Sequence, residues 1–290
     1  MGRVRSINSL VASAALALGV AAFAGCGSSD EDASPPPEPA ASQPSGQSAA
    51  PASPEQAAID GYRAFAVDNA ERHVDGFRRF AAAIEAGEID RAKTIYPEAR
   101  MPWERIEPVA GLFGALDPAI DAREGDVPDE TWGGWHYFEK RLWVEESTDG
   151  LASFIEETEA DATKLVEVAR TIELTPADIA TGAVDLLGEV SASKITGEEE
   201  RYSHTDLYDF QANVEGSKAA FEAVAPLVAD RELVDEISGR FTELLAALEG
   251  YREGDGFVAY TEVGESQRRE LSRLIDATAE PLSRVAAAVE

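Results

Sequence analysis

From Glu55 to the end of the chain, apolar residues recur every three or four positions, and strand-like alternation is hard to find. That spacing is the period of an α-helix that buries one face. A first long helix is expected over residues 55–86, with Gly87 as its stop. The pattern predicts about eight helices joined by short loops, and hence an all-α fold of two packed four-helix bundles.

Prolines and capping residues mark the boundaries of the later helices. Pro97 predicts a break in the second helix, and a third helix is expected to start after Pro102. Thr175 followed by Pro176 is a typical helix start. The helices after the first are expected over residues 89–101, 103–114, 131–143, 148–172, 175–196, 203–226, 230–253 and 265–289.

The N-terminal segment has the pattern of an export signal. Arg3 and Arg5 precede an apolar, alanine-rich run that ends just before Cys26. The run resembles a bacterial lipobox, with Phe23 in place of the usual leucine. We expect residues 1–25 to be a lipoprotein signal peptide and Cys26 to be lipidated, which provides a lipid anchor. An ordinary cleaved signal with an incidental cysteine is the alternative.

The segment after the predicted signal has the composition of a linker. Residues 26–54 are rich in Ser, Pro, Ala and Gln and cannot bury enough apolar surface to fold. We expect a disordered tether that joins the lipid to a helical domain over residues 55–290. The predicted product is an exported lipoprotein, tethered to the outer face of the cell membrane or in the periplasm.

The chain is strongly acidic, with a formal net charge of −30. A field of this sign repels nucleic acid and anionic lipid headgroups and concentrates cations near the surface. We therefore expect no nucleic-acid partner. Solubility or adaptation to salt explains the same charge without any binding site. The charge therefore argues against nucleic acid as a partner, but it does not by itself indicate what the protein binds.

Cys26 is the only cysteine of the chain, which leaves no thiol in the predicted folded domain. Any metal site there must use carboxylates, imidazoles, carbonyls or water. Such ligands suit hard or borderline cations such as iron, manganese, magnesium and calcium, and copper or zinc are also accepted by them.

One predicted helix carries a histidine and a glutamate within an aromatic stripe. His136 and Glu139 are three residues apart, which is weak evidence by itself in a chain with 55 acidic residues. Their position on an apolar face is more informative, because a buried carboxylate needs a compensating cation or hydrogen-bond donors. A metal ion is the sharpest candidate. The residues expected to share this face are Trp132, Trp135, His136, Glu139, Leu142 and Trp143.

A second stripe also places acids on an apolar face. Glu107 lies in it and Glu104 lies at its edge, one turn apart, so that both carboxylates are expected to reach the same point. Bundle cores bind metals through Glu and His from facing helices. Asp121 is a candidate for completing the ligand set, although its spacing alone favours a helix cap or turn residue.

The other histidines and the known catalytic motifs give less support. His73 is expected at the surface, and His204 is expected to pair with nearby aspartates at a helix start, with a second ion site as the alternative. A zinc peptidase motif is incomplete, because Lys140 follows Glu139 where a histidine is required. No nucleophile turn or phosphate-binding loop is present either, so we expect no enzyme of a known type.

Five motifs together resemble the imelysin-like proteins, and within them the EfeM/EfeO group of exported iron-uptake components. The motifs are Trp-Glu-Arg-Ile-Glu-Pro at 103–108, Gly-Trp-His-Tyr-Phe-Glu-Lys at 134–140, Tyr-Ser-His-Thr-Asp-Leu at 202–207, Asp-Phe-Gln-Ala-Asn-Val at 209–214 and Tyr-Arg-Glu-Gly-Asp-Gly-Phe at 251–257. The resemblance implies an all-helical fold of two four-helix bundles over residues 55–290, with a metal site. It implies His136 and Glu139 as motif ligands, Glu107 and Asp121 as acidic partners, and Glu104 as a fifth ligand.

The same resemblance implies a role in iron uptake. Such proteins are thought to capture iron, ferric or ferrous, outside the membrane and to pass it to a membrane iron permease, together with a haem peroxidase. Longer members carry a cupredoxin-like domain, and this chain resembles a short form that lacks it. The alternatives are an imelysin-type metallopeptidase, with Glu104 or Glu139 as general base, and a helical lipoprotein that binds other proteins.

Overall fold

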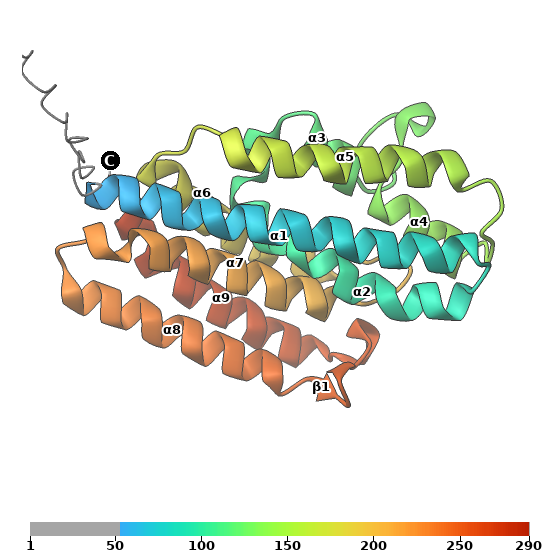
Figure 1. Ribbon diagram of the computed structural model, residues 1–290. Helices are drawn as coiled ribbons and strands as arrows, with labels where there is room; N and C mark the ends of the chain where they lie inside the picture. The colour runs from blue at the N-terminus through green and yellow to red at the C-terminus, as the bar shows by residue number, and fades with distance from the viewer. Residues whose placement is uncertain (1–52, 290) are drawn as a thin grey trace, which may run out of the picture. The chain divides into compact units, whose positions relative to one another are not determined.

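The computed structural model describes residues 53–289. The predicted signal peptide, Cys26 and nearly all of the predicted tether lie outside the described residues. Within them the backbone is almost entirely helical (Figure 1), so the prediction of an all-α fold is confirmed. The α-helices are α1 Pro54–Glu85, α2 Ile89–Ile106, α3 Leu116–Asp121, α4 Trp135–Trp143, α5 Ala152–Thr171, α6 Pro176–Ala192, α7 Asp206–Val224, α8 Arg231–Glu249 and α9 Glu265–Ala286.

Short elements connect these helices. A two-stranded antiparallel hairpin follows α8, formed by β1 Arg252–Glu253 and β2 Gly256–Phe257. The eighth helix therefore ends earlier than predicted, because the chain turns back at Gly254, whose φ is 60°. The 3₁₀ turns are η1 Glu107–Phe113, η2 Asp129–Thr131, η3 Lys194–Thr196, η4 Ala225–Leu227 and η5 Tyr260–Glu262.

Several helices begin where a side chain caps the first turn. The Thr175 hydroxyl accepts a hydrogen bond from the Asp178 backbone N–H, and the Asp178 carboxylate accepts one from the Thr175 N–H. Asp230 caps α8 by accepting from the Leu233 N–H at 3.1 Å. These bonds satisfy backbone N–H groups that a helix start otherwise leaves unpaired.

Two further helix boundaries differ from the sequence prediction. α2 continues through Pro97 and Pro102 to Ile106, so the predicted break and the separate third helix are wrong. A proline removes one hydrogen bond, and the packing of α2 along α1 and α7 compensates for that loss. The aromatic helix begins only at Trp135, because Gly134 adopts a φ of 75°. Trp132 therefore lies before α4, although it is still buried.

The helices of the second half form a four-helix bundle. α6 packs against α7 and α9, and α8 packs against the same two helices. In the first half, α1 packs between α2 and α5, and the short α3 and α4 contact α5 and α2 respectively. α7 also packs against α1 and α2, and this contact joins the two halves. Figure 1 shows α5, α1, α7 and α8 as successive layers from top to bottom.

Aromatic side chains fix α4 against α1 and α2. The Trp135 ring lies 5.3 Å from Phe77, 5.2 Å from Phe80 and 5.6 Å from Tyr96, measured between ring centroids. Phe138 packs edge-on against Phe80 at 5.6 Å. Edge-on aromatic pairs of this kind add specificity to the burial of large apolar surfaces. The neighbouring side chains of α4 are thereby held in defined positions.

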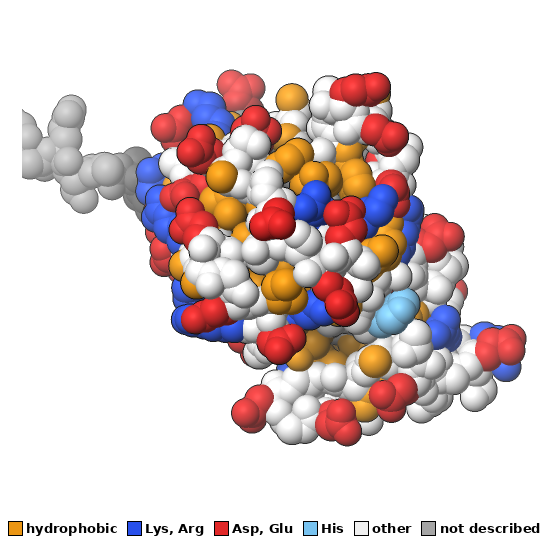
Figure 2. All heavy atoms as spheres, turned by 90° about the vertical axis from the view of Figure 1, so that its right-hand side faces the viewer, with side chains coloured by type: hydrophobic (Ala, Val, Ile, Leu, Met, Phe, Trp, Pro, Cys, Tyr) orange, Lys and Arg blue, Asp and Glu red, His pale blue; other side chains and the backbone are white. Residues whose placement is uncertain are grey.

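The surface carries both signs of charge. Figure 2 shows acidic and basic side chains scattered among apolar ones over the face at the right-hand side of Figure 1. Many exposed pairs are three or four residues apart on one helix, such as Arg269 with Glu265. Pairs of this type contribute little stability. Between residues 53 and 289, no helix is both long and apolar enough to cross a membrane.

Candidate metal centre

Charged side chains gather where α2, α3, α4, α7 and the segment after α6 meet, and most of them are buried, with Glu107 and Asp121 nearly so. The carboxylates outnumber the permanent cations, and burying charge is costly unless it is paired. We call this group the buried charge cluster. Its acids are Glu104, Glu107, Asp121, Glu139, Glu199, Glu200, Asp206 and Asp209, and its basic side chains are Arg100, Lys194 and His136. Burial raises the pKa values of Glu107, Glu200, Asp206 and Asp209, whereas the pKa values of Asp121, Glu139 and Glu199 are lowered by their cationic and hydrogen-bonding neighbours. The negative charge that favours a further cation is therefore concentrated around His136.

Gly134 brings the start of α4 against the end of α3. A Cβ atom at Gly134 would lie 2.2 Å from the Ile120 carbonyl oxygen, so no larger residue fits there. Since Asp121 follows Ile120 and His136 is two residues after Gly134, this close approach sets the two side chains side by side. The close contact between α3 and the start of α4 therefore requires glycine at position 134 of the motif.

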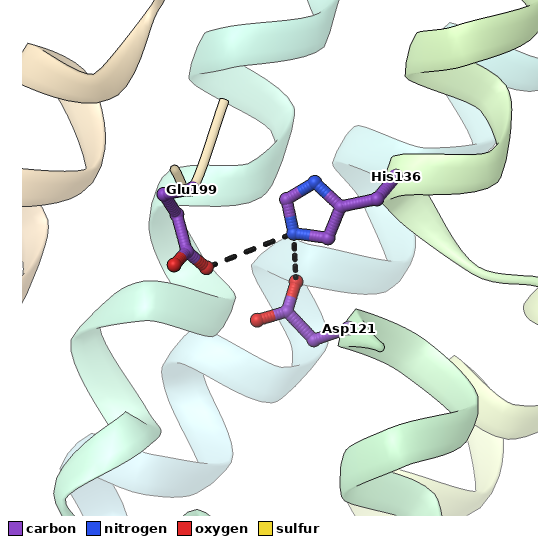
Figure 3. Close-up of side chains that lie close together, drawn as sticks. All are labelled: Asp121, His136 and Glu199. Atoms are coloured by element: carbon purple, nitrogen blue, oxygen red, sulfur yellow. Dashed lines mark ion pairs between the residues drawn. The ribbon is translucent and has the colours of Figure 1, made fainter. Parts of the chain in front are cut away.

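His136 has carboxylates on both sides of its ring. Its Nε2 lies 3.5 Å from Asp121 Oδ1 and 3.7 Å from Glu199 Oε1 (Figure 3). Its Nδ1 lies 3.4 Å from Glu139 Oε2. Two groups of three potential ligands result, Asp121–His136–Glu199 and His136–Glu139–Glu200, each with its ligand atoms within 4.8 Å of one another. Burial and Arg100 lower the pKa of His136, but the three carboxylates beside it raise that pKa well above the usual value.

The predicted ligand Glu139 is bonded to the backbone as well as to His136. Its Oε1 accepts hydrogen bonds from the N–H groups of Tyr202 and Ser203, both at 2.8 Å. Burial raises the pKa of Glu139, but His136 and the two N–H groups outweigh that effect and lower it. The carboxylate is therefore held ionised and in a fixed orientation.

The carboxylates of Glu104 and Glu107 lie close together, as expected, and both bond the ammonium of Lys194. The Lys194 ammonium donates to both Glu107 oxygens at 2.8 Å and to Glu104 Oε2 at 3.2 Å. The Asn213 amide donates to the same two carboxylates at 3.0 and 2.7 Å. A role for these two glutamates as metal ligands stays a prediction. Neither glutamate belongs to the two potential ligand groups found within residues 53–289.

Arg100 neutralises another part of the buried charge cluster. Its guanidinium lies 2.6 Å from Asp121 and 2.8 Å from Glu200, and its Nη2 donates to Glu104 at 2.5 Å. Burial raises the pKa of Asp121, but Arg100 and His136 hold it well below the usual range. Burial likewise opposes the ionisation of Glu199, and Lys194 and His136 lower its pKa to about 2. Both carboxylates beside Nε2 are therefore ionised at neutral pH.

A polar pocket of about 220 Å³ leads from the surface to the cluster. Glu107, Asp121 and Glu199 line its inner part. Arg123 lies along one wall and pairs with Glu199 at 3.2 Å and with Asp126 at 3.1 Å. The other lining residues are Asp117, Pro118, Ala122, Val127 and Glu189. Its many carboxylates make the pocket suitable for the entry of a cation.

Sequence patterns did not identify Glu199, Glu200, Lys194 or Arg100 as members of the site. Glu199 and Glu200 belong to an acidic run between two helices, which is usually a solvated loop. Here that loop folds inward and both side chains are buried. No local signal marks such a loop as buried, because its partners lie on helices far away in the sequence.

Of the other two histidines, His73 differs from the expectation, and His204 lies at a helix start as expected. His73 is buried and not at the surface, because its face of α1 packs on α4, where Trp135 Nε1 donates to His73 Nε2 at 2.8 Å. Burial lowers the pKa of His73 to about 3. His204 precedes α7 with a φ of 58°, and the nearby Asp206 and Asp209 are buried in the charge cluster. Within the described residues, neither potential ligand group includes His204.

The family model for imelysin, a peptidase M75 family, matches residues 58–285. The chain belongs to the imelysin family. An EfeM/EfeO family lipoprotein of Staphylococcus haemolyticus is 40% identical over 248 residues, which cover 81% of this chain and 84% of the relative. One of Staphylococcus aureus (strain COL) is 40% identical over 216 residues, or 72% and 76% of the two chains. The predicted resemblance to EfeM/EfeO-type imelysin proteins is thus confirmed.

Proposed function

We propose that this imelysin protein is an exported, lipid-anchored carrier that captures iron outside the membrane for uptake. The observation that carries the proposal is His136, a buried imidazole with carboxylates at both ring nitrogens. Two of these carboxylates, Asp121 and Glu199, line an acidic pocket that opens to the surface. The related staphylococcal proteins are named lipoproteins, which supports a lipid anchor at Cys26. A membrane iron permease, with a haem peroxidase, is the partner that the resemblance implies.

The ligand chemistry favours iron without excluding copper or zinc. Carboxylates favour ferric iron for its charge, and an imidazole also binds ferrous iron, copper and zinc. The proposed ligands are His136, Asp121 and Glu139. Glu107 and Glu104, which pair with Lys194, are further candidates. In this role the ion is cargo, so the site has to hold it and later release it.

Thermal unfolding of the purified chain tests the proposal. A ligand that binds only the folded state adds RT ln(1 + [L]/Kd), about 2.7 kcal/mol at one hundred times Kd. For a domain of this size we expect Tm to rise by roughly 5–10 °C with ferric ion supplied as a weak chelate. His136→Ala should abolish the shift, and His204→Ala should keep it. If no shift occurs with ferric, ferrous, copper, zinc or manganese ions, the proposal is wrong.

A peptidase function has weaker support. It would need a metal-bound water and a free general base near the substrate. Glu139 is bonded to two backbone N–H groups, and Lys140 bonds Glu124, which is not a member of the cluster. Chelator-sensitive cleavage of peptides by the parent chain, lost in His136→Ala, would favour the peptidase function over the carrier function.

A further inference from the structure

The irregular segment between η3 and α7, residues 197–204, forms one wall of the buried charge cluster. It carries Glu199 and Glu200, whose side chains are buried. Two of its backbone N–H groups bond the Glu139 carboxylate, each at 2.8 Å. We call residues 197–204 the acidic segment. None of these groups lies in a helix, so their positions depend on the contacts that fix the segment.

The backbone turns sharply at each end of the acidic segment. Gly197 has a φ of 85° and His204 has a φ of 58°, both in the left-handed region. Glycine adopts this conformation freely, but a histidine there is strained and keeps it only when neighbouring contacts hold the turn. The His204 N–H donates to the Glu200 carbonyl at 2.9 Å, within the segment. The turn at His204 depends on contacts from outside the segment as well.

Tyr260 of η5 contacts the chain at both ends of the acidic segment. Its N–H donates to the His204 carbonyl at 2.9 Å, and its hydroxyl donates to the Ile195 carbonyl at 2.6 Å, two residues before Gly197. Its ring lies against the Gly197 backbone, where an added Cβ atom would be only 3.0 Å from the ring. All three contacts are made with the backbone, so they do not depend on which side chains of the cluster are charged.

Helices α7 and α9 hold Tyr260 in turn. Its ring packs edge-on against Phe210 of α7, with the ring centroids 5.2 Å apart. The Arg268 guanidinium of α9 lies 4.4 Å from the centre of the Tyr260 ring and donates to the Tyr260 carbonyl at 3.1 Å. Tyr260 is buried, with 2% of its surface exposed. It therefore connects the acidic segment to the framework of the second bundle.

The hairpin of β1 and β2, which precedes η5, fixes the start of α7 (Figure 1). The Phe257 ring packs edge-on against Tyr208, with the ring centroids 5.1 Å apart. The Arg252 guanidinium lies 4.0 Å from the centre of the Phe257 ring and donates to Gln211 Oε1 at 2.6 Å. The Tyr-Arg-Glu-Gly-Asp-Gly-Phe motif thus joins the connection between α8 and α9 to residues that directly follow the acidic segment.

On the cluster side, ion pairs contribute much of the hold on the acidic segment. Glu199 pairs with Arg123 at 3.2 Å, and Glu200 lies 2.8 Å from Arg100. Each of these arginines also pairs with an aspartate, so it has another partner when the segment moves. Because Glu199 lines the polar pocket, an outward movement of the segment would widen the route from the surface to the cluster.

We propose that Tyr260 is a positioning residue, which holds the acidic segment in its inward position through the backbone at both ends. Without the Tyr260 hydroxyl the segment opens more often, and each opening moves Glu199 and Glu200 away from the cluster. The effect on cation capture rests on the proposed function. Opening speeds both the entry and the release of a cation, and it leaves Kd nearly unchanged because the closed form still predominates.

Hydrogen exchange of the full chain, measured without any cation, tests the positioning role. Tyr260→Phe keeps the ring against Gly197 and removes only the hydroxyl that donates to Ile195. We expect the amide hydrogens of the acidic segment to exchange about 3- to 10-fold faster, which is the effect of one lost hydrogen bond on a local opening. This exchange should not depend on low concentrations of urea, because a local opening exposes little surface.

Tyr251→Phe is the matched control. Tyr251 lies in the same connection between α8 and α9, and it accepts a hydrogen bond from the Val258 N–H through its backbone carbonyl, which the substitution keeps. In this variant the acidic segment should exchange as it does in the parent. Circular dichroism checks that both variants fold. Unchanged exchange in Tyr260→Phe, or exchange of the segment only through urea-dependent unfolding of the whole domain, overturns the proposal.

Cation kinetics measure the same opening in another way, with Co²⁺ as the probe because its visible spectrum reports binding. In Tyr260→Phe, release of Co²⁺ to a chelator should be about 3- to 10-fold faster, with Kd within about twofold of the parent value. A Kd that rises by the same factor as the release rate would mean that the hydroxyl stabilises only the bound state, which contradicts the proposal.

The two proposals fail on different results. The exchange measurement needs no cation, so it decides the role of Tyr260 whether or not the protein carries iron. The proposed carrier function is overturned only if ferric ion and the other ions leave Tm unchanged.

Discussion

At the scale of single residues, Lys194 is the internal counter-ion of the buried charge cluster. Its ammonium contacts Glu104, Glu107 and Glu199, and these carboxylates raise the pKa of Lys194 well above its usual value against the opposing effect of burial. Lys194→Met would remove the cation that contacts Glu107, and it would leave Glu104 with Arg100 alone and Glu199 with Arg123. We expect the free energy of unfolding at pH 7 to fall by about 3–5 kcal/mol, measured by urea denaturation.

The same variant should bind cations more tightly, because Lys194 no longer competes for Glu199. Lys164→Met is the matched control, since Lys164 pairs with Glu167 on an exposed helix face. We expect it to change stability by less than about 0.5 kcal/mol. Equal losses in the two lysine variants would show that Lys194 has no special role in the cluster.

Some members of the buried charge cluster could be predicted from the sequence, and others could not, for a physical reason. The apolar stripe identified His136 and Glu139, and the structure sets Asp121 beside them. Arg100 and Lys194 gave no signal, because a basic residue in an acidic chain is normally solvated. Their burial depends on carboxylates that reach them from distant segments, and helical spacing reports only neighbours on one helix.

At the scale of elements, a close helix contact holds part of the cluster in place. A Cβ atom at Gly216 of α7 would lie 2.2 Å from the Arg105 carbonyl oxygen of α2. This close approach brings Asn213 of α7 within hydrogen-bond distance of Glu104 and Glu107. Gly216→Ala should force the two helices apart and lower the free energy of unfolding by about 1–3 kcal/mol, measured by urea denaturation.

Gly239→Ala provides the control for the preceding prediction. Gly239 lies in α8, and nothing lies within 4 Å of an added Cβ atom there. Alanine is the better helix former, so this variant should gain about 0.5–1 kcal/mol. A stabilised Gly216→Ala variant would mean that α2 and α7 do not need the glycine contact.

Helix existence could be predicted from the sequence, whereas the ends of helices depended on tertiary contacts. The long α1 and the capped start of α6 at Thr175 follow from apolar period and local capping, which act within one element. The continuation of α2 through Pro97 and Pro102 could not be predicted in this way, because packing against α1 and α7 overrides the local cost of each proline. The inward fold of the loop at Glu199 has the same kind of cause.

At the scale of the whole molecule, surface charge and buried charge respond differently to salt. The formal net charge of −30 acts through water and is screened over about 8 Å at physiological ionic strength. Charges inside the cluster are screened far less. A cation-dependent rise in Tm at constant ionic strength therefore reports specific binding and not general screening of an acidic protein, and its loss in His136→Ala assigns it to the cluster.

The proton balance of the molecule predicts how cation binding depends on pH. With its pKa raised by Asp121, Glu139 and Glu199, His136 is protonated near neutral pH in the ion-free protein. Its charge stabilises the fold below the unfolded pKa, and this contribution is lost as pH rises through the higher folded pKa. Glu199, with a pKa of about 2, stays ionised throughout the neutral range. Binding of a cation to the imidazole of His136 therefore has to expel the proton that the imidazole carries.

Acid should weaken cation binding for this reason. Below the folded pKa of His136, the Kd for Co²⁺ is expected to rise about tenfold for each unit that the pH falls. Isothermal titration calorimetry between pH 6 and 8, in buffers of different ionisation enthalpy, measures both Kd and proton release. About one proton per ion is expected from competition at a single imidazole. A Kd that does not change over this range, or binding without proton release, would mean that the ion does not use the imidazole of His136.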